Sequence, residues 1–301
     1  MRLVMKYARG STRHQNTSSD MRIITTVREM RDAAAEAYAS GSRIAFVPTM
    51  GYLHEGHLSL VDAARAHADV VVMSIFVNPL QFAPTEDLAR YPRDIEGDSC
   101  KAEGRGVDVL FLPSEKEIYP QEQRITLNPG ALATRWDGEV RPGHFSGVLT
   151  VVLKLLNVVR PHVLHLGQKD IQQALLVRAM CEDLDVGTEV RIEPTVRDAD
   201  GLALSSRNSY LSAEDRDMAL AIPRSLQAIR AAFAQPGKKE TETLLSRGEE
   251  VLSSEPGVKV DYLALVNPAT LEPREGRALD GDIALVAARV GGTRLIDNIV
   301  L

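Results

Sequence analysis

From residue 21 to about residue 195, short apolar runs rich in β-branched residues alternate with segments of helical pattern. The runs are continuously apolar, which predicts strands covered on both faces, as in a parallel sheet. The strand-like runs are RIAFVPT (43–49), VVVMSIFV (70–77), VDVLFLP (107–113), HVLHLG (162–167) and EVRIEPT (189–195). The helical candidates lie around residues 27–40, 57–68, 94–104, 148–159 and 171–184. This alternation predicts a doubly wound α/β domain over residues 21–195, with ligands at the carboxyl ends of its strands.

After about residue 195 the pattern changes. A long helical pattern (213–234) contains Pro223, which should start, end or kink a helix, and a second helix is expected near 241–253. Three strand-like segments follow, joined by Gly and Pro turns, at 258–266, 283–290 and 293–301. These elements predict a smaller α+β domain over residues 196–301.

Composition limits the kinds of partner. The chain has 301 residues, 44% of them apolar and 25% charged, which is typical of a globular protein that can bury a core. A net charge of −6 argues against nonspecific nucleic-acid binding but allows a locally positive pocket for a small anion. No apolar run approaches the ~20 residues that span a bilayer. Residues 1–20 are basic and polar without the apolar stretch of a secretory signal, so we expect a flexible extension and a cytoplasmic protein.

Two cysteines are present, Cys100 and Cys181. This number excludes a disulfide framework or a cysteine-rich zinc site within the chain. Neither cysteine has a histidine beside it, so we interpret both as buried or incidental thiols.

The stretch PTMGYLHEGH (48–57) raises a question, because His54 and His57 lie three residues apart around Glu55 and Gly56. Metal binding is one interpretation, but the spacing differs from the HExxH zinc motif and no third ligand is evident nearby. Ordinary histidines at the start of a helix are the second interpretation. The third is a phosphate site, since the stretch joins an apolar strand to an apolar-periodic helix. Free N–H groups and the helix dipole make that position receptive to anions.

Two further stretches follow strand-like runs. In SIFVNPLQF (74–82), Asn78 and Gln81 are placed to bind hydroxyl or carboxylate groups, although a turn-forming Asn-Pro and a surface glutamine are the simpler alternative. In GQKDIQQ (167–173), Lys169 can reach phosphate oxygens and Asp170 can accept from ribose hydroxyls, with Gln173 one turn further on. A solvated Lys–Asp pair is the alternative interpretation there.

Three polar stretches are less specific. DGLALSSRN (200–208) brings Ser205, Ser206 and Arg207 together, either as a mobile clasp for a polyphosphate or as a serine-capped helix start. RPGHFSGV (141–148) offers Arg141 and His144 as substrate or phosphate contacts. In YPRDIEGDSC (91–100), the carboxylates of Glu96 and Asp98 could meet Mg²⁺ through water, or could belong to a charged helix face.

Taken in order, these motifs resemble the pantothenate synthetase (pantoate–β-alanine ligase) family, whose HEGH-type stretch is the HxGH signature of the adenylate-forming nucleotidyltransferases. The resemblance runs from about residue 21 to the C-terminus and is densest up to residue 211. It implies a Rossmann-like, doubly wound parallel sheet and a C-terminal lid domain. It also implies that pantoate and ATP give pantoyl adenylate and pyrophosphate, after which β-alanine gives pantothenate and AMP. Mg²⁺ and a homodimer are implied as well.

By similarity, three segments should bind ATP: Met50, Gly51, Tyr52, Leu53, His54, Glu55, Gly56 and His57; Gly167, Gln168, Lys169 and Asp170; and Val196, Leu204, Ser205, Ser206 and Arg207. The donors expected to act in catalysis are His54, His57, Lys169, Ser205, Ser206 and Arg207, with His57 at the family's proton-donor position. Gln81 and Gln173 match the glutamines that hold pantoate, Gln81 near β-alanine, and Asn78 is placed with them. Asp98 is the metal candidate.

Two other functions fit parts of the pattern. A cytidylyl- or adenylyltransferase shares HxGH but keeps the nucleotide in its product, whereas the glutamine pair and the LSSRN loop favour release of AMP. A nonenzymatic ATP-binding regulator with this fold is disfavoured by the full set of phosphate-facing groups.

Overall fold

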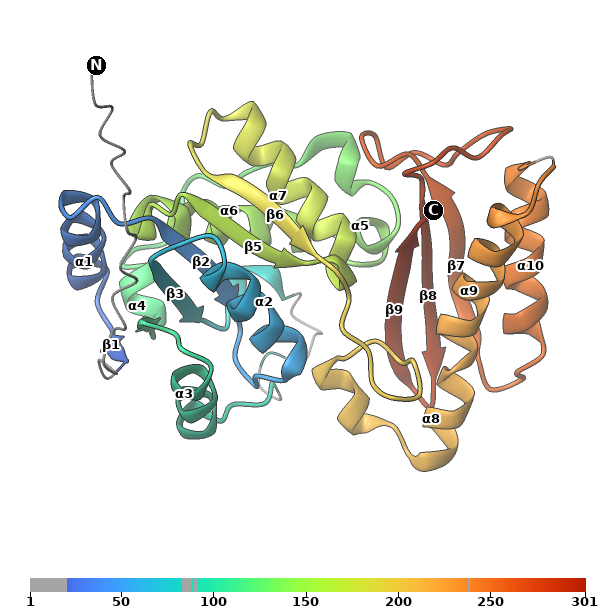
Figure 1. The fold of residues 1–301 in the computed structure, drawn as a ribbon, viewed down its shortest axis with the longest axis horizontal. Coiled ribbons are helices and arrows are strands. Elements are labelled where there is room, and N and C mark those ends of the chain that lie inside the picture. Colours follow the sequence, from blue (N-terminus) through green and yellow to red (C-terminus); the bar gives the residue numbers. More distant parts are fainter. Residues whose placement is uncertain (1–20, 83–87, 89–90, 238) are drawn as a thin grey trace, which may run out of the picture.

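The computed structural model describes residues 21–82, 88, 91–237 and 239–301, so the expected flexible extension (1–20) lies outside the described residues. Figure 1 shows a large α/β part and, beside it, a three-stranded sheet flanked by two long helices. The predicted fold class is confirmed, because the larger sheet is parallel throughout and the smaller one is antiparallel. Among the described residues, no helix is long and apolar enough to cross a membrane.

The larger sheet has its strands in the order β1-β4-β3-β2-β5-β6. Its strands are β1 (Arg22–Ile24), β2 (Ile44–Thr49), β3 (Val70–Ile75), β4 (Val109–Phe111), β5 (Val163–Gly167) and β6 (Glu189–Glu193). The chain proceeds outward from β2 through β3 to β4, then crosses to the other side of β2 to form β5 and β6. The order therefore reverses between β2 and β5, and ligands of such sheets bind where the carboxyl ends of the reversing strands meet.

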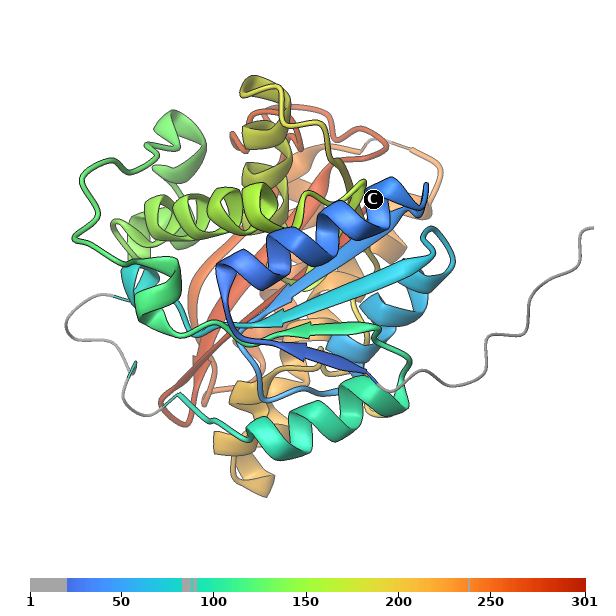
Figure 2. The ribbon, with the colours of Figure 1, turned by 90° about the vertical axis from the view of Figure 1, so that its left-hand side faces the viewer.

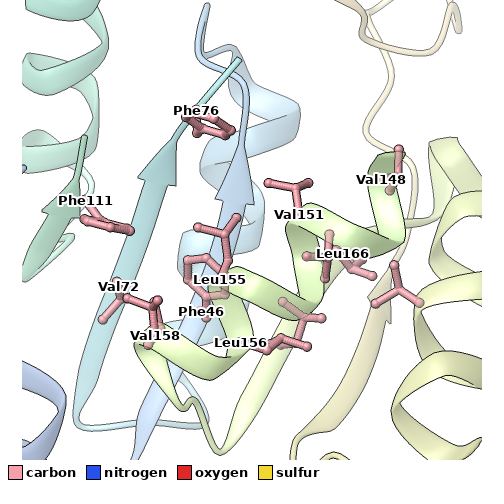
Figure 3. Packing of buried hydrophobic residues seen from close by; sticks show 14 of the residues in the cluster. Phe46, Val72, Phe76, Phe111, Val148, Val151, Leu155, Leu156, Val158 and Leu166 are labelled. Atoms are coloured by element: carbon pink, nitrogen blue, oxygen red, sulfur yellow. The ribbon is translucent and has the colours of Figure 1, made fainter. Parts of the chain in front are cut away.

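Helices cover both faces of this sheet (Figure 2). One face carries α1 (Val27–Ala39), α6 (His144–Val159) and α7 (Ile171–Asp183), and the other carries α2 (Glu55–Arg65) and α3 (Ile95–Gly104). Successive strand residues point to opposite faces, so Phe46 joins the core beneath α6 while Val47 joins the core beneath α2. Figure 3 shows side chains of α6 gathered over Phe46 and Val72. This double coverage explains why the strand sequences lack polar alternation.

Short elements fill the connections: η1 (Pro79–Gln81), α4 (Glu115–Ile118), η3 (Gly130–Ala133), α5 (Asp137–Val140), η4 (Gln168–Asp170) and η5 (Ser206–Tyr210). The sequence pattern did not predict them, nor the three-residue strand β1. Helix α6 also begins at His144, four residues before the expected 148. Gly147 permits this, because a Cβ there would lie 2.2 Å from the Leu80 carbonyl oxygen.

The C-terminal part comprises α8 (Ala213–Ala219), α9 (Ala221–Ala234), α10 (Thr241–Ser253), β7 (Lys259–Val266), β8 (Ile283–Val290) and β9 (Thr293–Val300). The strands form an antiparallel sheet in chain order, and α9 and α10 share a core with it. The expected long helix (213–234) is two helices, and Pro223 lies in the first turn of α9, where a missing N–H costs little.

The two parts pack directly on each other. Ile171 and Leu175 of α7 join a core cluster with Val266 and Leu285 of the smaller sheet. The Trp136 indole N–H donates to the Leu271 carbonyl at 2.8 Å. The C-terminal sheet therefore has a defined position beside the carboxyl end of β5.

Candidate active site

Two motifs lie at the reversal point of the sheet, directly after β2 and β5. The turn after β2 carries Gly51 with φ +86° and Tyr52 with φ +52°, and it leads into α2 at Glu55. The turn after β5 is η4, which contains Lys169 and leads into α7. Parallel strands bring their carboxyl ends to one edge, so these distant segments form one site.

The turn after β2 is held by Asp98 of α3, whose side chain is only 1% exposed. Its two carboxylate oxygens accept the backbone N–H groups of Tyr52 at 2.6 Å and Leu53 at 2.7 Å. Lys101, one turn further along α3, donates to the Leu53 carbonyl oxygen at 2.9 Å. These three contacts were not predicted. The interpretation of Asp98 as part of a charged helix face was wrong, because its side chain is buried against the turn after β2.

The histidine pair caps α2. The Nδ1 atom of His54 accepts the Gly56 N–H at 3.1 Å, and Nδ1 of His57 accepts the His54 N–H at 3.4 Å. An imidazole whose Nδ1 accepts a hydrogen bond carries its proton on Nε2. Both rings therefore keep an Nε2–H donor for a ligand, and their centroids lie 4.1 Å apart. The histidines cap the helix, as the second interpretation has it, and this capping leaves their Nε2–H groups available for the anion of the third.

The charged residues of the turn after β5 affect the pKa values of both histidines. Burial, and then the charge of Lys169, lowers the pKa of His54. Burial and the neighbouring His54 lower the pKa of His57 to about 3, so this ring is neutral at physiological pH. Protein atoms around Asp170 oppose its ionisation although half of the side chain is exposed, and the charges of Lys169 and Arg207 outweigh this effect and lower its pKa. His54, His57, Lys169 and Asp170 thus lie within reach of one another's charge, and Arg207 lies within reach of Asp170.

The depressed pKa of His57 predicts a pH-dependent stability. Below its ordinary pKa of 6.5 the unfolded chain binds a proton at this ring that the folded chain does not bind. Stability therefore falls as the pH drops, by about 1.4 kcal/mol per pH unit for this group, or about 2 kcal/mol at pH 5. We expect urea unfolding at pH 7 and pH 5 to reveal this loss in the wild type and a smaller one in His57→Gln. The other histidines are common to both proteins, so an equal loss in the two would contradict the assignment.

Gln81 contacts Met50 of the turn after β2, and Asn78 contacts Gln81. Gln81 is 8% exposed and its Nε2 donates to the Met50 sulfur at 2.8 Å. Asn78 is 1% exposed, donates to Gln81 Oε1 at 3.2 Å and to the Gly147 carbonyl oxygen at 3.1 Å, and accepts the Tyr119 hydroxyl at 2.8 Å. Asn78 therefore positions Gln81 and α6 in this structure.

The RPGHFSGV stretch adjoins the same corner. His144 Nδ1 contacts the Gln81 carbonyl oxygen at 2.8 Å, and its Nε2 lies 3.0 Å from the Arg141 guanidinium. His144 is also close enough to Asp170 to influence the pKa of that carboxyl. Gln173, in the first turn of α7, is partly buried.

The third segment is a hairpin followed by a short helix. Residues 197–203 close through Arg197 and Ala203, and Gly201 turns with φ +95°. The carboxylates of Asp198 and Asp200 both bind Arg216 of α8, so the hairpin is anchored to the C-terminal part. The chain then passes Leu204, whose Cβ lies 3.7 Å from the position that a Cβ on Gly56 would take, and enters η5.

Within η5, Ser205 caps the helix by accepting the Arg207 N–H at 3.2 Å. Ser206 lies beside Tyr91, a residue whose pKa is raised to about 12 by burial in spite of the Arg207 charge. A cavity of about 10 Å³, the size of one water, separates this segment from Lys169 and Asp297. The structure thus brings Leu204 and the Ser205–Arg207 group to the two turns at the sheet edge.

Some predicted site residues point elsewhere. The Glu55 side chain pairs with Arg105 at the surface, and Gln168 Nε2 donates to Asn298 at 3.0 Å. The Val196 carbonyl oxygen accepts the Leu204 N–H at 3.0 Å. The polar groups named here are therefore engaged by other parts of the protein.

In the described part of the chain, no cluster of three His, Cys, Asp or Glu side chains could hold a metal ion. Asp98 does not fit a direct magnesium ligand, since its side chain is 1% exposed and both of its oxygens face backbone N–H groups. We therefore assign it no step in the chemistry.

The contacts of Asp98 predict a stability effect. In Asp98→Asn, one of the two backbone N–H groups would face an NH₂ group, and an unsatisfied buried donor costs about 1–3 kcal/mol. We expect denaturant unfolding to show a loss of that size. Asp94→Asn is the matched control, because Asp94 caps α3 at the surface and asparagine caps equally well. Equal stability of Asp98→Asn and the wild type would refute this role.

The fold and this edge are those of a doubly wound α/β protein with an anion-receptive site at its reversal point. The model of the pantoate-beta-alanine ligase family matches residues 22–300, and the chain belongs to this family. It is 49% identical over 281 residues to pantothenate synthetase 1 of Bradyrhizobium diazoefficiens, covering 93% of this chain and 98% of that one. The pantothenate synthetase of Moorella thermoacetica is 48% identical over 284 residues, with 93% and 99% covered.

Solved structures of proteins of this family match the fold of the chain. A crystal structure of pantothenate synthetase from Thermus thermophilus matches with a TM-score of 0.87 at 47% identity, covering 93% of this chain and 99% of that one. Pantoate-beta-alanine ligase from Francisella tularensis, complexed with beta-gamma ATP and beta-alanine, matches with a TM-score of 0.75 at 36% identity, covering 93% and 97%. The family resemblance of the motifs is thereby confirmed.

Proposed function

We propose that this protein is an AMP-forming pantoate–β-alanine ligase that makes pantothenate. In the first step a carboxylate oxygen of pantoate bonds to the α-phosphorus of ATP. The bond from that phosphorus to the bridging oxygen breaks, and pyrophosphate leaves. In the second step the β-alanine amine attacks the pantoyl carbonyl carbon, the bond to the phosphate oxygen breaks, AMP leaves, and the ammonium formed on the nitrogen loses a proton to solvent.

The observation that carries the proposal is the convergence of three segments on one sheet edge, in a chain of this family. The first step joins two anions, so the site must offset their repulsion and stabilise charge on pyrophosphate. Fixed donors suit that task, because they need no reorganisation as the charge develops. Such donors come from His54 and His57, from Lys169, and from Ser205, Ser206 and Arg207.

Each of the three segments contributes a different kind of ATP contact. We assign ATP to Met50–His57, to Gly167–Asp170, and to Val196 with Leu204–Arg207. Because the rings of His54 and His57 carry Nε2–H groups, they would bind phosphate oxygens as neutral donors, whereas Lys169 and Arg207 would supply charge. Asp170, kept ionised by Lys169, suits ribose hydroxyls. The chemistry is then positioning and electrostatics, with no covalent enzyme intermediate.

Pantoate and β-alanine are assigned to the neighbouring glutamines. Gln81 and Gln173 are neutral, so they can bind hydroxyl and carboxylate groups without fixing a charge beside the reacting carboxylate. Gln81 is buried next to Met50, which supports a place between the acid and the nucleotide. Asn78 acts in this proposal by holding Gln81.

Several further features belong to the proposal. Mg²⁺ would enter with the triphosphate as part of the substrate. A cytoplasmic homodimer is what the family resemblance implies. Residues 21–195 and 196–301 would form the substrate-binding domain and the lid domain, and sedimentation of the purified protein would test the dimer.

The decisive assay measures AMP. We expect AMP formation that requires both pantoate and β-alanine, together with pyrophosphate exchange into ATP that requires pantoate alone. A nucleotide retained in the organic product would instead point to a nucleotidyltransferase. Absence of turnover with these three substrates would refute the proposed function.

A further inference from the structure

Two neighbouring residues of β9, Asp297 and Asn298, touch both halves of the proposed triphosphate site. They are 3% and 1% exposed, and no motif drew attention to them. Lys169 belongs to the turn after β5, whereas Arg207 follows the hairpin at 197–203. Nothing in the sequence explains how these two cations are kept at a fixed separation.

Asn298 binds the turn after β5 that carries Lys169, called the lysine turn below. Its side-chain nitrogen donates to the Gln168 carbonyl oxygen at 2.8 Å and to the Lys169 carbonyl oxygen at 3.1 Å. Its side-chain oxygen accepts from Gln168 Nε2 at 3.0 Å. The turn lacks a side-chain cap of its own, as does α7 after it. The backbone that carries Lys169 is therefore held from the C-terminal sheet.

Asp297 binds the hairpin at 197–203, which leads to Arg207. Its carboxylate accepts two hydrogen bonds from the Arg197 guanidinium, at 2.6 Å and 2.9 Å, and also accepts the Asn298 N–H at 2.8 Å. Arg197 donates in addition to the Gly201 carbonyl oxygen at 3.1 Å, across the hairpin. A bidentate guanidinium–carboxylate pair fixes orientation as well as distance. The base of the segment leading to Arg207 is thus fixed to the residue next to Asn298.

We propose that Asp297 and Asn298 act as positioning residues for adenylate formation, by holding the Lys169 turn and the Arg207 segment at the separation that one triphosphate requires. The inference rests on the proposed function. A misplacement of about 1 Å in a preorganised site can cost ~10² in rate. The second step involves no triphosphate, so it depends far less on this separation.

The test uses Asn298→Asp, which keeps the shape but cannot donate to the two carbonyl groups. We expect pantoate-dependent pyrophosphate exchange to fall ~10–100-fold in kcat, while the reaction of supplied pantoyl adenylate with β-alanine changes less than about threefold. Asn267→Asp is the matched control, because Asn267 caps a turn after β7 on the same sheet and does not contact the lysine turn. We expect it to behave as the wild type in both steps.

Arg197→Lys provides a second variant that keeps the charge but loses the bidentate geometry, and we expect the same split between the two steps. Equal losses in both steps, or no loss, would overturn the proposal. Hydrogen–deuterium exchange of the same proteins gives a readout besides activity. We expect residues 167–173 in Asn298→Asp, and 197–208 in Arg197→Lys, to exchange faster than in the wild type, and unchanged exchange would also overturn it. Should the wild type itself form no AMP, the proposed function fails, while the exchange result still judges the positioning contacts.

Discussion

Replacing Lys169 with alanine is expected to slow pantoate-dependent pyrophosphate exchange by ~10²–10³, about 3–4 kcal/mol of transition-state stabilisation. The ammonium is the cation of the turn after β5, with 18% of its side chain exposed. Its neighbour Asp170 lies 3.6 Å away and is itself half-exposed. The loss should appear in kcat, because the charge that Lys169 stabilises grows as pyrophosphate departs.

Lys169→Met separates charge from packing, since it keeps most of the aliphatic chain. We expect it to be as slow as Lys169→Ala, with both unfolding at wild-type denaturant concentrations. Lys116→Ala, at an exposed position of helix α4, serves as the control and should keep full activity. Exchange at the wild-type rate in the two Lys169 variants would remove this residue from the site.

His57→Ala is expected to produce a loss of similar size, ~10²–10³ in pyrophosphate exchange. The reason differs, because the pKa of His57 is about 3 and the ring is neutral before ATP binds. A neutral ring contributes a directed N–H donor, as an amide can. We therefore expect His57→Gln to recover at least a tenth of the wild-type rate.

The pair of substitutions distinguishes a neutral donor from an acid. If His57→Gln were as slow as His57→Ala while both remained folded, His57 would have to act through a proton that glutamine cannot supply. His67→Ala is the control for loss of an imidazole, because His67 lies beyond the far end of α2. It should leave the exchange rate unchanged.

The fold could be predicted largely because the strands are covered on both faces. Continuous apolar runs such as 70–77 leave few alternatives to a buried parallel strand, and the structure confirms this one as β3. The short elements escaped prediction, since four residues such as 137–140 carry no usable periodicity. The start of α6 at His144 depends on a close approach of Gly147 to Leu80, a contact that local sequence does not reveal.

The site could be predicted only where the chain itself marks a strand end. His54 and Lys169 follow apolar runs directly, and a parallel sheet brings such ends together. Asp98, Lys101 and Asn298 act on backbone atoms that are 45 or more positions away in the chain. Nothing in their own neighbourhoods signals those partners, so their contacts became visible only in three dimensions.

The central claim is that three distant segments bind one triphosphate together. Hydrogen–deuterium exchange, with and without a nonhydrolysable ATP analogue plus pantoate, tests it most directly. We predict simultaneous protection of residues 50–57, 167–170 and 204–207, with no change in the surface around Arg28 and Lys116. Protection of only one segment, or of that surface instead, would contradict the account.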